Sequence, residues 1–326
     1  MSNSAPISVV IPLYNKAGFV CKAIQTVLMQ TWQHFEVIVV DDGSTDDGAE
    51  QVLRFSNESR VRLIRQRNRG TGAARNTGIA NSYGDPIAFL DADDEWMPSH
   101  LGAIAGLAQR FPTAGVLATN FDIIDEQHVQ RRWADPSVAF PHTVLLDTPQ
   151  YFELSAWNRG PACIQTSCCA LRRSVYEHLG GFIEKGHQSS LGEDQEYWAR
   201  VALHYPIAYD PATTSIYRLD IPNSALRGAV PDGWYPPVVR TVKDHLAREP
   251  EAPDAQQMRD FAAKILLNHV SRLLQRGKKA EGLALLQDDI LQGCRWNQRI
   301  TRLRVGSHLP PAVIRAIVAT RTAMAA

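Results

Sequence analysis

The chain is predicted to fold as an α/β domain around a mostly parallel sheet, followed by a helical C-terminal extension. Two observations lead to this fold class. Short apolar runs rich in Val and Ile alternate with segments of helical apolar spacing, and two of the runs stop abruptly at clusters of acidic residues. Buried parallel strands read as near-continuous Val, Ile and Leu runs, and their alternation with helices is typical of a sheet covered on both faces.

The first 120 residues supply the alternating elements. We expect strands at 7–11, 35–40, 61–64, 87–90 and 116–119. We expect helices at 17–30, 47–55 and 98–110, and another that follows the glycine-rich segment 70–76 and runs through residue 80. Pro98 lies in the first turn of its helix, where proline is favoured.

The pattern loosens after Asn120 and changes again near residue 235. Residues 121–142 read as irregular, and the later segments are expected as a strand at 165–172 and helices at 148–158, 174–179, 193–204, 255–275, 279–291 and 310–323. The helices around Gly277 resemble an α-hairpin. We therefore divide the chain into a domain of residues 1–225 and a helical extension of residues 226–326.

The charge balance limits the classes of partner. The 326 residues carry 34 basic and 34 acidic side chains, so there is no overall footprint of a nucleic-acid-binding protein. From Arg295 onward the chain has six arginines and no acid (Arg295, Arg299, Arg302, Arg304, Arg315 and Arg321). This segment either contacts an anionic surface such as a membrane or forms a solvated helical end.

The cysteines and the hydropathy pattern bear on location. Five cysteines without Cys-x-x-Cys spacing, and an N-terminus without a cationic leader, favour a reducing compartment. No window supplies the roughly 18 apolar residues of a membrane span. The expected location is the cytoplasm, either free or peripheral to the inner face of the membrane.

The acidic clusters follow two of the predicted strands. Asp41 and Asp42 come directly after 35–40, and Asp91, Asp93 and Asp94 follow 87–90. The carboxyl ends of parallel strands share one edge of the sheet, which is where open α/β sheets bind ligands. These acids could simply cap helices and form turns. Two crowded clusters instead favour a divalent-cation and nucleotide site, because carboxylates repel one another without a cation or donor-rich ligand.

Five segments, in this order, resemble the inverting family 2 glycosyltransferases of the GT-A fold, of the bacterial surface-polysaccharide type. They are Ile7–Asn15, Val40–Asp46, Asn68–Asn76, Phe89–Asp94, and Gly181-Phe182 followed by Gly192–Trp198. The resemblance covers residues 6–220 and leaves the last hundred residues aside. The Gln-x-x-Arg-Trp signature of processive polysaccharide synthases is absent, which favours addition of a single sugar to an acceptor.

The nucleotide would lie at the carboxyl edge. Pro12, Tyr14 and Asn15 end the first strand there and would line the base pocket, although Tyr14 could equally be plain packing. An acid after a buried strand can accept a hydrogen bond from the imide N–H of a base, and the resemblance assigns this role to Asp42. Asp41 is expected to cap the helix that follows. It also places Arg75 beside the nucleotide, where a guanidinium and a helix N-terminus favour phosphate.

Asp91 and Asp93 are two residues apart and point the same way in extended geometry. Their hard oxygens suit Mg²⁺ or Mn²⁺, which also bind diphosphate oxygens. The resemblance makes Asp93 the direct ligand and puts Asp91 nearer the ribose. Asp94 and Glu95 are expected to cap the helix that starts near Pro98.

The resemblance makes Asp194 the general base that deprotonates the acceptor hydroxyl, with a purely structural cap as the alternative. Glu193 is expected to bind the acceptor or to cap the helix. Trp198 could stack on a sugar face, and His187 is a candidate acceptor contact. Arg218 is a secondary candidate near the diphosphate.

These features together predict a metal-dependent inverting transfer from a nucleotide-sugar, expected to be a UDP-sugar, to a glycan or lipid-linked saccharide. The C-terminal extension could close over the acceptor, form a homodimer, or lie on the membrane. A nucleotidyltransferase would need a Gly-rich phosphate loop directly after the first strand, which the segment Pro12–Asn15 does not supply. An inactive nucleotide-sugar-binding module is a further alternative.

Overall fold

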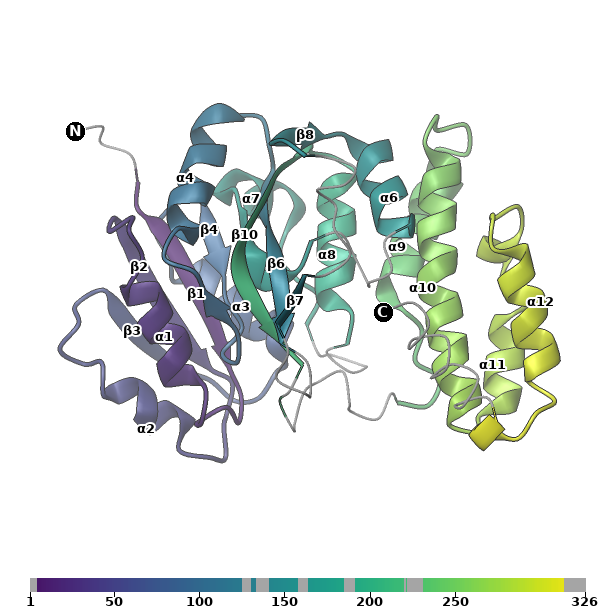
Figure 1. Ribbon diagram of the computed structural model, residues 1–326, viewed down its shortest axis with the longest axis horizontal. Helices are drawn as coiled ribbons and strands as arrows, with labels where there is room; N and C mark the ends of the chain where they lie inside the picture. Colours follow the sequence, from purple (N-terminus) through teal and green to yellow (C-terminus); the bar gives the residue numbers. More distant parts are fainter. Residues whose placement is uncertain are drawn as a thin grey trace.

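A computed structural model describes residues 5–124, 130–132, 141–157, 164–184, 191–219, 221 and 231–313. A single twisted sheet runs through the first two thirds of the chain, with helices on both of its faces and a group of C-terminal helices at one side (Figure 1). The strands follow the order β3-β2-β1-β4-β9-β6-β10-β5, with β7 paired to β6 and β8 paired to β10.

The first half of the sheet is parallel, as the apolar runs predict. It consists of β3 (Val61–Arg65), β2 (Phe35–Asp41), β1 (Ile7–Leu13) and β4 (Ile87–Phe89). Every residue of β1 and β2 is buried, which explains why neither strand shows an alternating pattern. Their carboxyl ends meet at one edge.

The second half of the sheet is mixed and departs from the prediction. The short strand β9 (Cys169–Leu171) lies between β4 and β6 (Val116–Ile124) and is antiparallel to both. The long strand β10 (Ile207–Arg218) runs parallel to β6 and antiparallel to β5 (Glu95–Trp96) and β8 (Val144–Leu146). The three-residue strand β7 (Gln130–Arg132) pairs with β6.

The strand β10 was not predicted, and β6 extends five residues beyond its predicted end. In β10 the pairing with β6 is irregular between Asp210 and Ser215, and half of the strand is only partly buried. Such a segment shows neither a continuous apolar run nor a clean alternation, so its sequence carries no strand signal.

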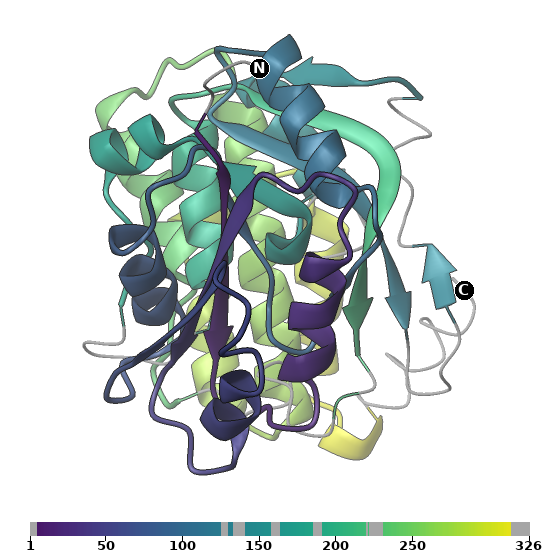
Figure 2. The ribbon, with the colours of Figure 1, turned by 90° about the vertical axis from the view of Figure 1, so that its left-hand side faces the viewer.

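Helices cover both faces of the sheet (Figure 2). One hydrophobic cluster joins the sheet to α1 (Val20–Leu28), α2 (Gly48–Leu53) and α4 (His100–Arg110). A second cluster joins the opposite face to α3 (Thr71–Ala80), α7 (Arg173–Leu179) and α8 (Glu193–Ala202). The predicted helices of the first 120 residues are therefore all present.

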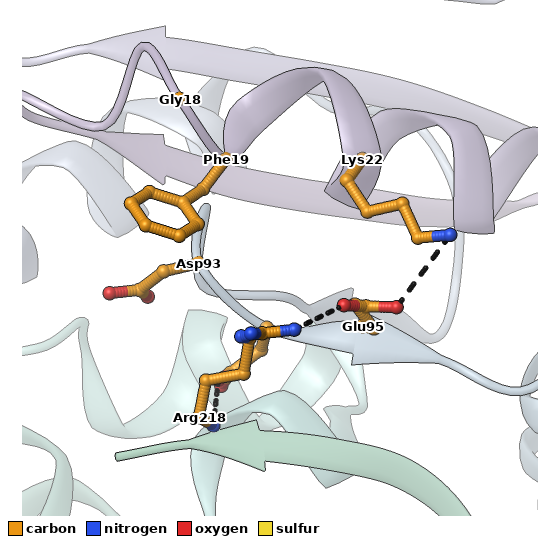
Figure 3. A pocket seen from close by; sticks show the side chains of 7 residues that line it. Gly18, Phe19, Lys22, Asp93, Glu95 and Arg218 are labelled. Atoms are coloured by element: carbon orange, nitrogen blue, oxygen red, sulfur yellow. Dashed lines mark hydrogen bonds and ion pairs between the residues drawn. The ribbon is translucent and has the colours of Figure 1, made fainter. Parts of the chain in front are cut away.

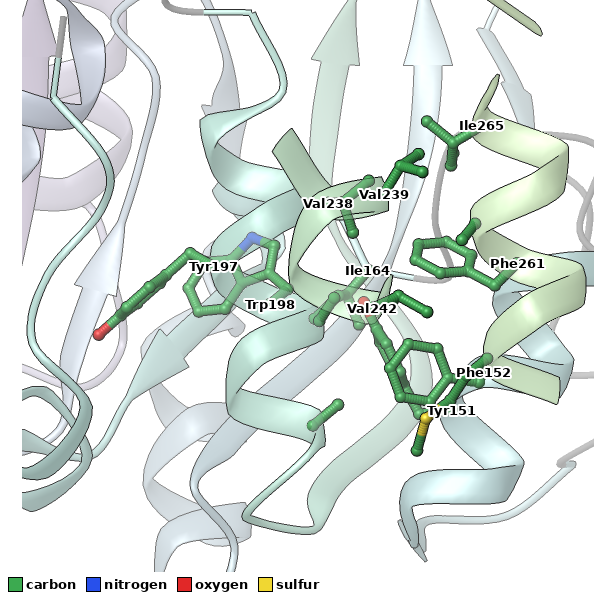
Figure 4. Packing of buried hydrophobic residues seen from close by; sticks show 14 of the residues in the cluster. Tyr151, Phe152, Ile164, Tyr197, Trp198, Val238, Val239, Val242, Phe261 and Ile265 are labelled. Carbon is green, nitrogen blue, oxygen red and sulfur yellow. The ribbon is translucent and has the colours of Figure 1, made fainter. Parts of the chain in front are cut away.

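The C-terminal helices continue the second cluster. The helix α9 (Pro237–Arg248) packs on α8, and α10 (Ala255–Gln275) packs on α9 and on α6 (Thr148–Trp157). Valines of α9 lie between Trp198 of α8 and the rings of α6 and α10 (Figure 4). The chain division at residues 225 and 226 stays a prediction, but the helices on either side of it share one hydrophobic core.

The end of the chain differs from its predicted helices. The segment predicted at 255–275 is α10, but 279–291 divides into α11 (Lys279–Leu285) and a 3₁₀ turn (Asp289–Leu291). The helix α12 (Asn297–Gly306) is present where none is expected. Most of the helix predicted at 310–323 lies outside the described residues. Among the described helices, none is both long enough and apolar enough to cross a bilayer.

The shared core predicts that the C-terminal helices unfold together with the sheet. Phe261 of α10 is fully buried against Tyr151 and Phe152 of α6. Replacing Phe261 with Ala should lower the free energy of unfolding by about 3–5 kcal/mol, in one cooperative transition followed by circular dichroism in urea. The control Tyr83→Ala, at a side chain that is 66% exposed, should change it by less than about 0.5 kcal/mol. Two separate transitions in wild type would contradict the shared core.

Candidate active site

The carboxyl edge of the sheet brings together side chains that are far apart in the sequence. Asp42 follows β2, and Asp91 and Asp93 follow β4. The loop after β1 contributes Lys16, whose side chain reaches Asp93. The helix α8 begins at the same edge and adds Asp194 in its first turn. The two acidic clusters of the sequence and the later acidic pair therefore lie at one edge of the sheet.

Asp42 is buried and organises the loop that follows β3. Its carboxylate accepts hydrogen bonds from the Gln66 side chain (2.7 Å), the Arg69 backbone N–H (2.9 Å) and the Gly70 backbone N–H (2.8 Å). A carboxylate offers about four acceptor positions, so room remains for one further donor. Recognition of a base imide by Asp42 stays a prediction. Asp41 accepts a hydrogen bond from the Ser44 N–H in the loop before α2, which begins at Gly48, so its expected role as a helix cap is corrected.

The three predicted nucleotide contacts near the end of β1 lie in different surroundings. The ladder with β2 continues through Pro12 to Leu13, so Pro12 lies inside the sheet and is buried, which corrects its expected place in a base pocket. Asn15 has a positive φ of 52°, and its side-chain oxygen accepts a hydrogen bond from the Thr45 N–H (2.7 Å). This side chain therefore joins two loops. Tyr14 is 47% exposed and is available to a ligand.

Arg75 is the centre of a buried ion-pair network. Its guanidinium donates to Asp91 (2.7 Å) and to Glu193 (3.0 Å), lies over the Phe182 ring, and the residue is 2% exposed. Burial acts to lower the pKa of Arg75, but the two carboxylates raise it above its ordinary value. The guanidinium thus connects the end of β4 to α8, and the direct contact of Arg75 with the nucleotide stays a prediction.

Glu193 and Asp194 differ in their access to solvent. Glu193 is buried, and burial together with the neighbouring Asp194 raises its pKa to about 8, while Arg75 opposes this shift. The predicted acceptor contact of Glu193 is corrected, because its carboxylate is inside and holds Arg75. Asp194 is only partly buried. Burial raises its pKa and Arg75 lowers it, and a carboxylate with a raised pKa is a better general base near neutral pH.

Asp93 is partly exposed and forms an ion pair with a lysine. The ammonium group of Lys16 lies 2.5 Å from an Asp93 oxygen. Burial raises the pKa of Asp93, the Lys16 ammonium opposes that shift, and Asp91 reinforces it. Within the described part of the chain no three His, Cys, Asp or Glu side chains could together hold a metal. Two carboxylates still fit Mg²⁺, which is commonly bound by one or two carboxylates and the phosphates of a substrate.

Asp94 does not cap a helix, which corrects the expectation from sequence. It is buried and accepts hydrogen bonds from the Ser167 hydroxyl (2.6 Å), the Gln165 side chain (3.1 Å) and the Arg218 N–H (3.0 Å). The helix α4 begins only at His100. Asp94 instead fixes the end of β10 and the turn before β9. Nothing local in the sequence indicates these partners, which lie more than 70 residues away.

A small pocket opens beside Asp93 (Figure 3). Its volume is about 290 Å³, and it is lined by Gly18, Phe19, Lys22, Asp93, Asp94, Glu95 and Arg218. Within it Glu95 pairs with Arg218 (2.9 Å) and lies 3.9 Å from the Lys22 ammonium. The pocket therefore places two cationic side chains next to the predicted metal ligand.

The remaining predicted acceptor contacts have different outcomes. Trp198 is 1% exposed, packs against Phe89 and Phe182, and donates to the Thr166 hydroxyl (3.3 Å). Its predicted stacking on a sugar is corrected, because the ring is part of the core. His187 lies outside the described residues. Lys16 was not predicted as a site residue, although a cation three residues after a strand that ends at this edge was a usable signal.

Comparison with known proteins gives a consistent family. The profile described as Glycosyl transferase family 2 matches residues 8–180. An uncharacterized glycosyltransferase of Rickettsia conorii is 46% identical over 92 residues, which are 28% of this chain and 15% of that protein. The succinoglycan biosynthesis protein ExoW of Rhizobium meliloti is 44% identical over 102 residues, 30% of this chain and 32% of that protein. The aligned segments thus span about a third or less of these relatives.

A solved structure extends the likeness to nearly the whole chain. The crystal structure of S. aureus TarS 1-349 in complex with UDP-GlcNAc has a TM-score of 0.70 and covers 93% of this chain and 88% of that chain. Its sequence identity is 17%, so the likeness concerns the fold. The predicted GT-A architecture is confirmed, and the likeness extends into the C-terminal helices.

The buried Glu193 predicts a pH-dependent stability. Although Glu193 accepts a hydrogen bond from Arg75, burial raises its folded-state pKa to about 8, so below that pH its carboxyl group keeps a proton in the folded state that the unfolded state has released above about pH 4.5. Stability should therefore fall as pH rises from 5 to 8, by up to about 1.4 kcal/mol per pH unit from this group. Glu193→Gln should lose that slope in urea unfolding measured across this range. The exposed carboxylate variant Glu184→Gln should keep it, and equal slopes in all three proteins would refute the assignment.

Proposed function

The chain belongs to glycosyl transferase family 2, and on this premise we propose that it moves one sugar from a nucleotide-sugar to a glycan or lipid-linked saccharide, with inversion. The observation that carries the proposal is the buried Arg75, which ties Asp91 on the donor side to Glu193, the neighbour of Asp194. A donor-side carboxylate and a candidate base are thus held at one edge of the sheet. The complex of S. aureus TarS with UDP-GlcNAc supports a UDP-sugar as the donor.

In the proposed reaction Asp194 takes the proton of the acceptor hydroxyl. The hydroxyl oxygen then forms a bond to the anomeric carbon as the bond from that carbon to the diphosphate oxygen breaks, and the proton remains on Asp194. The electron pair leaves with the nucleoside diphosphate. Its growing negative charge would be met at this edge by the cationic side chains of Lys16 and Arg218.

We further propose that Mg²⁺ or Mn²⁺ is bound by Asp93, with Asp91 beside it, when the donor diphosphate is present. A bound divalent cation would supply Lewis-acid stabilisation of the leaving phosphate. Each carboxylate already has one oxygen in an ion pair, Asp91 with Arg75 and Asp93 with Lys16, but only the Lys16 ammonium sits on a flexible stem that can move away, so Asp93 is the more available ligand. Asp93 is also the direct ligand that the family resemblance implies.

Replacing Asp194 with Asn should lower turnover of a UDP-sugar by at least about 100-fold, because the amide cannot accept the hydroxyl proton. Calorimetric titration with UDP, GDP and dTDP, each with and without Mn²⁺, should show the same metal-dependent binding of one nucleotide in wild type and variant. Unchanged turnover would remove Asp194 as the base. Binding without turnover in wild type, across a panel of donors and acceptors, would favour the inactive module.

We also propose that the end of the chain contacts an anionic membrane. Within the described residues, positions 295–313 carry four arginines and no acid. Val305, Leu309 and Val313 are 65%, 39% and 41% exposed in the same segment. Basic side chains beside exposed apolar ones suit the interface of an anionic bilayer.

Binding of the protein to phosphatidylcholine vesicles should therefore require added phosphatidylglycerol, as measured by cosedimentation. Arg302→Gln should weaken this binding roughly fivefold, since each cation near the surface contributes about 1 kcal/mol. The exposed Arg248, at the end of α9, offers a matched control, and Arg248→Gln should leave binding unchanged. Equal binding to neutral and anionic vesicles would contradict an electrostatic contact.

A further inference from the structure

Asp93, the proposed metal ligand, already holds a cation supplied by the chain itself. The Lys16 ammonium lies 2.5 Å from one Asp93 oxygen, and the two side chains are only 15% and 20% exposed. A divalent cation on this carboxylate would lie within a few ångströms of the ammonium, and like charges at that separation repel strongly. Lys16 and a metal therefore compete for Asp93.

The backbone around Lys16 is fixed, so the competition is between side-chain positions. The Asn15 N–H donates to the Ser44 hydroxyl (3.1 Å), and the Ala17 N–H donates to the Asp46 carboxylate (2.9 Å). The Lys16 carbonyl accepts from the Phe19 N–H (3.0 Å) as the chain turns into α1. Only the flexible four-carbon stem of Lys16 is left to move.

The second cation at this edge is not able to move in this way. Arg75 is bound by two carboxylates at once, and its side chain is 3% exposed. A guanidinium that donates hydrogen bonds to a carboxylate on each side is a fixed part of the core. An ammonium group is instead a compact point charge that readily changes partners. Of the two carboxylates that follow β4, Asp91 is thus neutralised by the fixed cation Arg75. Asp93 is neutralised by Lys16, which can leave it.

We propose that Lys16 is a donor-sensing residue that occupies Asp93 until the diphosphate arrives, then moves to the phosphate oxygens and yields Asp93 to the metal. This inference rests on the proposed metal-dependent function. The diphosphate supplies the negative charge that draws the ammonium away, and the same movement removes the repulsion that opposes the divalent cation. Metal and nucleotide binding become coupled, so that each strengthens the other.

The test is the affinity of the protein for Mn²⁺ alone, followed by electron paramagnetic resonance of the free ion. Lys16→Met removes the competing cation and should tighten Mn²⁺ binding without nucleotide by roughly tenfold, a typical size for such a coupling. The same variant should bind UDP in the presence of Mn²⁺ at least about fivefold more weakly, because a phosphate contact is lost. Lys16→Gln should behave in the same way and serves as a second variant if the first folds poorly.

Lys22 provides the matched control. It lies in the first turn of α1, six residues after Lys16, and its ammonium is 3.9 Å from Glu95 rather than paired with Asp93. Lys22→Met removes the same charge and should leave the Mn²⁺ affinity of the nucleotide-free protein unchanged.

The outcomes separate this inference from the function on which it rests. Equal Mn²⁺ affinity in wild type and both Lys16 variants, with metal-dependent UDP binding retained, overturns the role of Lys16 and leaves the proposed function intact. An equal gain in the Lys22 control also overturns it, because the effect is then one of overall charge. Absence of Mn²⁺ binding in every protein, with and without UDP, overturns both.

Discussion

The buried pairing of Arg75 with Asp91 and Glu193 is the constraint on which the site depends. It joins the end of β4 to the first turn of α8, two elements that are about a hundred residues apart in the chain. Removing one partner from such a network leaves a buried charge uncompensated, which typically costs about 3–5 kcal/mol. The geometry between the donor side and the candidate base is therefore held by the core itself, and the ligand does not have to create it.

Around this network the same residue type serves different purposes because its surroundings differ. Asp42 and Asp94 are buried, and their oxygens accept hydrogen bonds from backbone and side-chain donors. These bonds fix the loops at the edge of the sheet. Burial raises the pKa of Asp94 well above its ordinary value, and Asp93 and Asp91 add to that shift. Asp93 and Asp194 keep contact with solvent and are left for ligands. Separating carboxylates by environment is how one fold assigns them structural and chemical roles.

The helical end of the chain is part of this arrangement rather than an appendage to it. The helix α9 packs directly against α8, which carries Glu193 and Asp194, and α10 supports α9 through the aromatic cluster of α6. Close packing transmits displacements, so the position of the candidate base depends on residues beyond the part of the chain that matches the family profile. The TarS likeness, which spans 93% of this chain, agrees with a fold that includes these helices.

The sequence by itself determined the parallel half of the sheet, the helices around it and the clustering of the acids at one edge, because these follow from apolar runs and local order along the chain. It also carried the family resemblance through ordered motifs. Only the tertiary structure decided that β9 and β10 complete the sheet, that Trp198 is core, and that Arg75 faces carboxylates and Lys16 faces Asp93. The physical reason is that strand pairing, burial and ion pairing join residues about 16 to 120 positions apart, and no local pattern encodes which side chain will meet which.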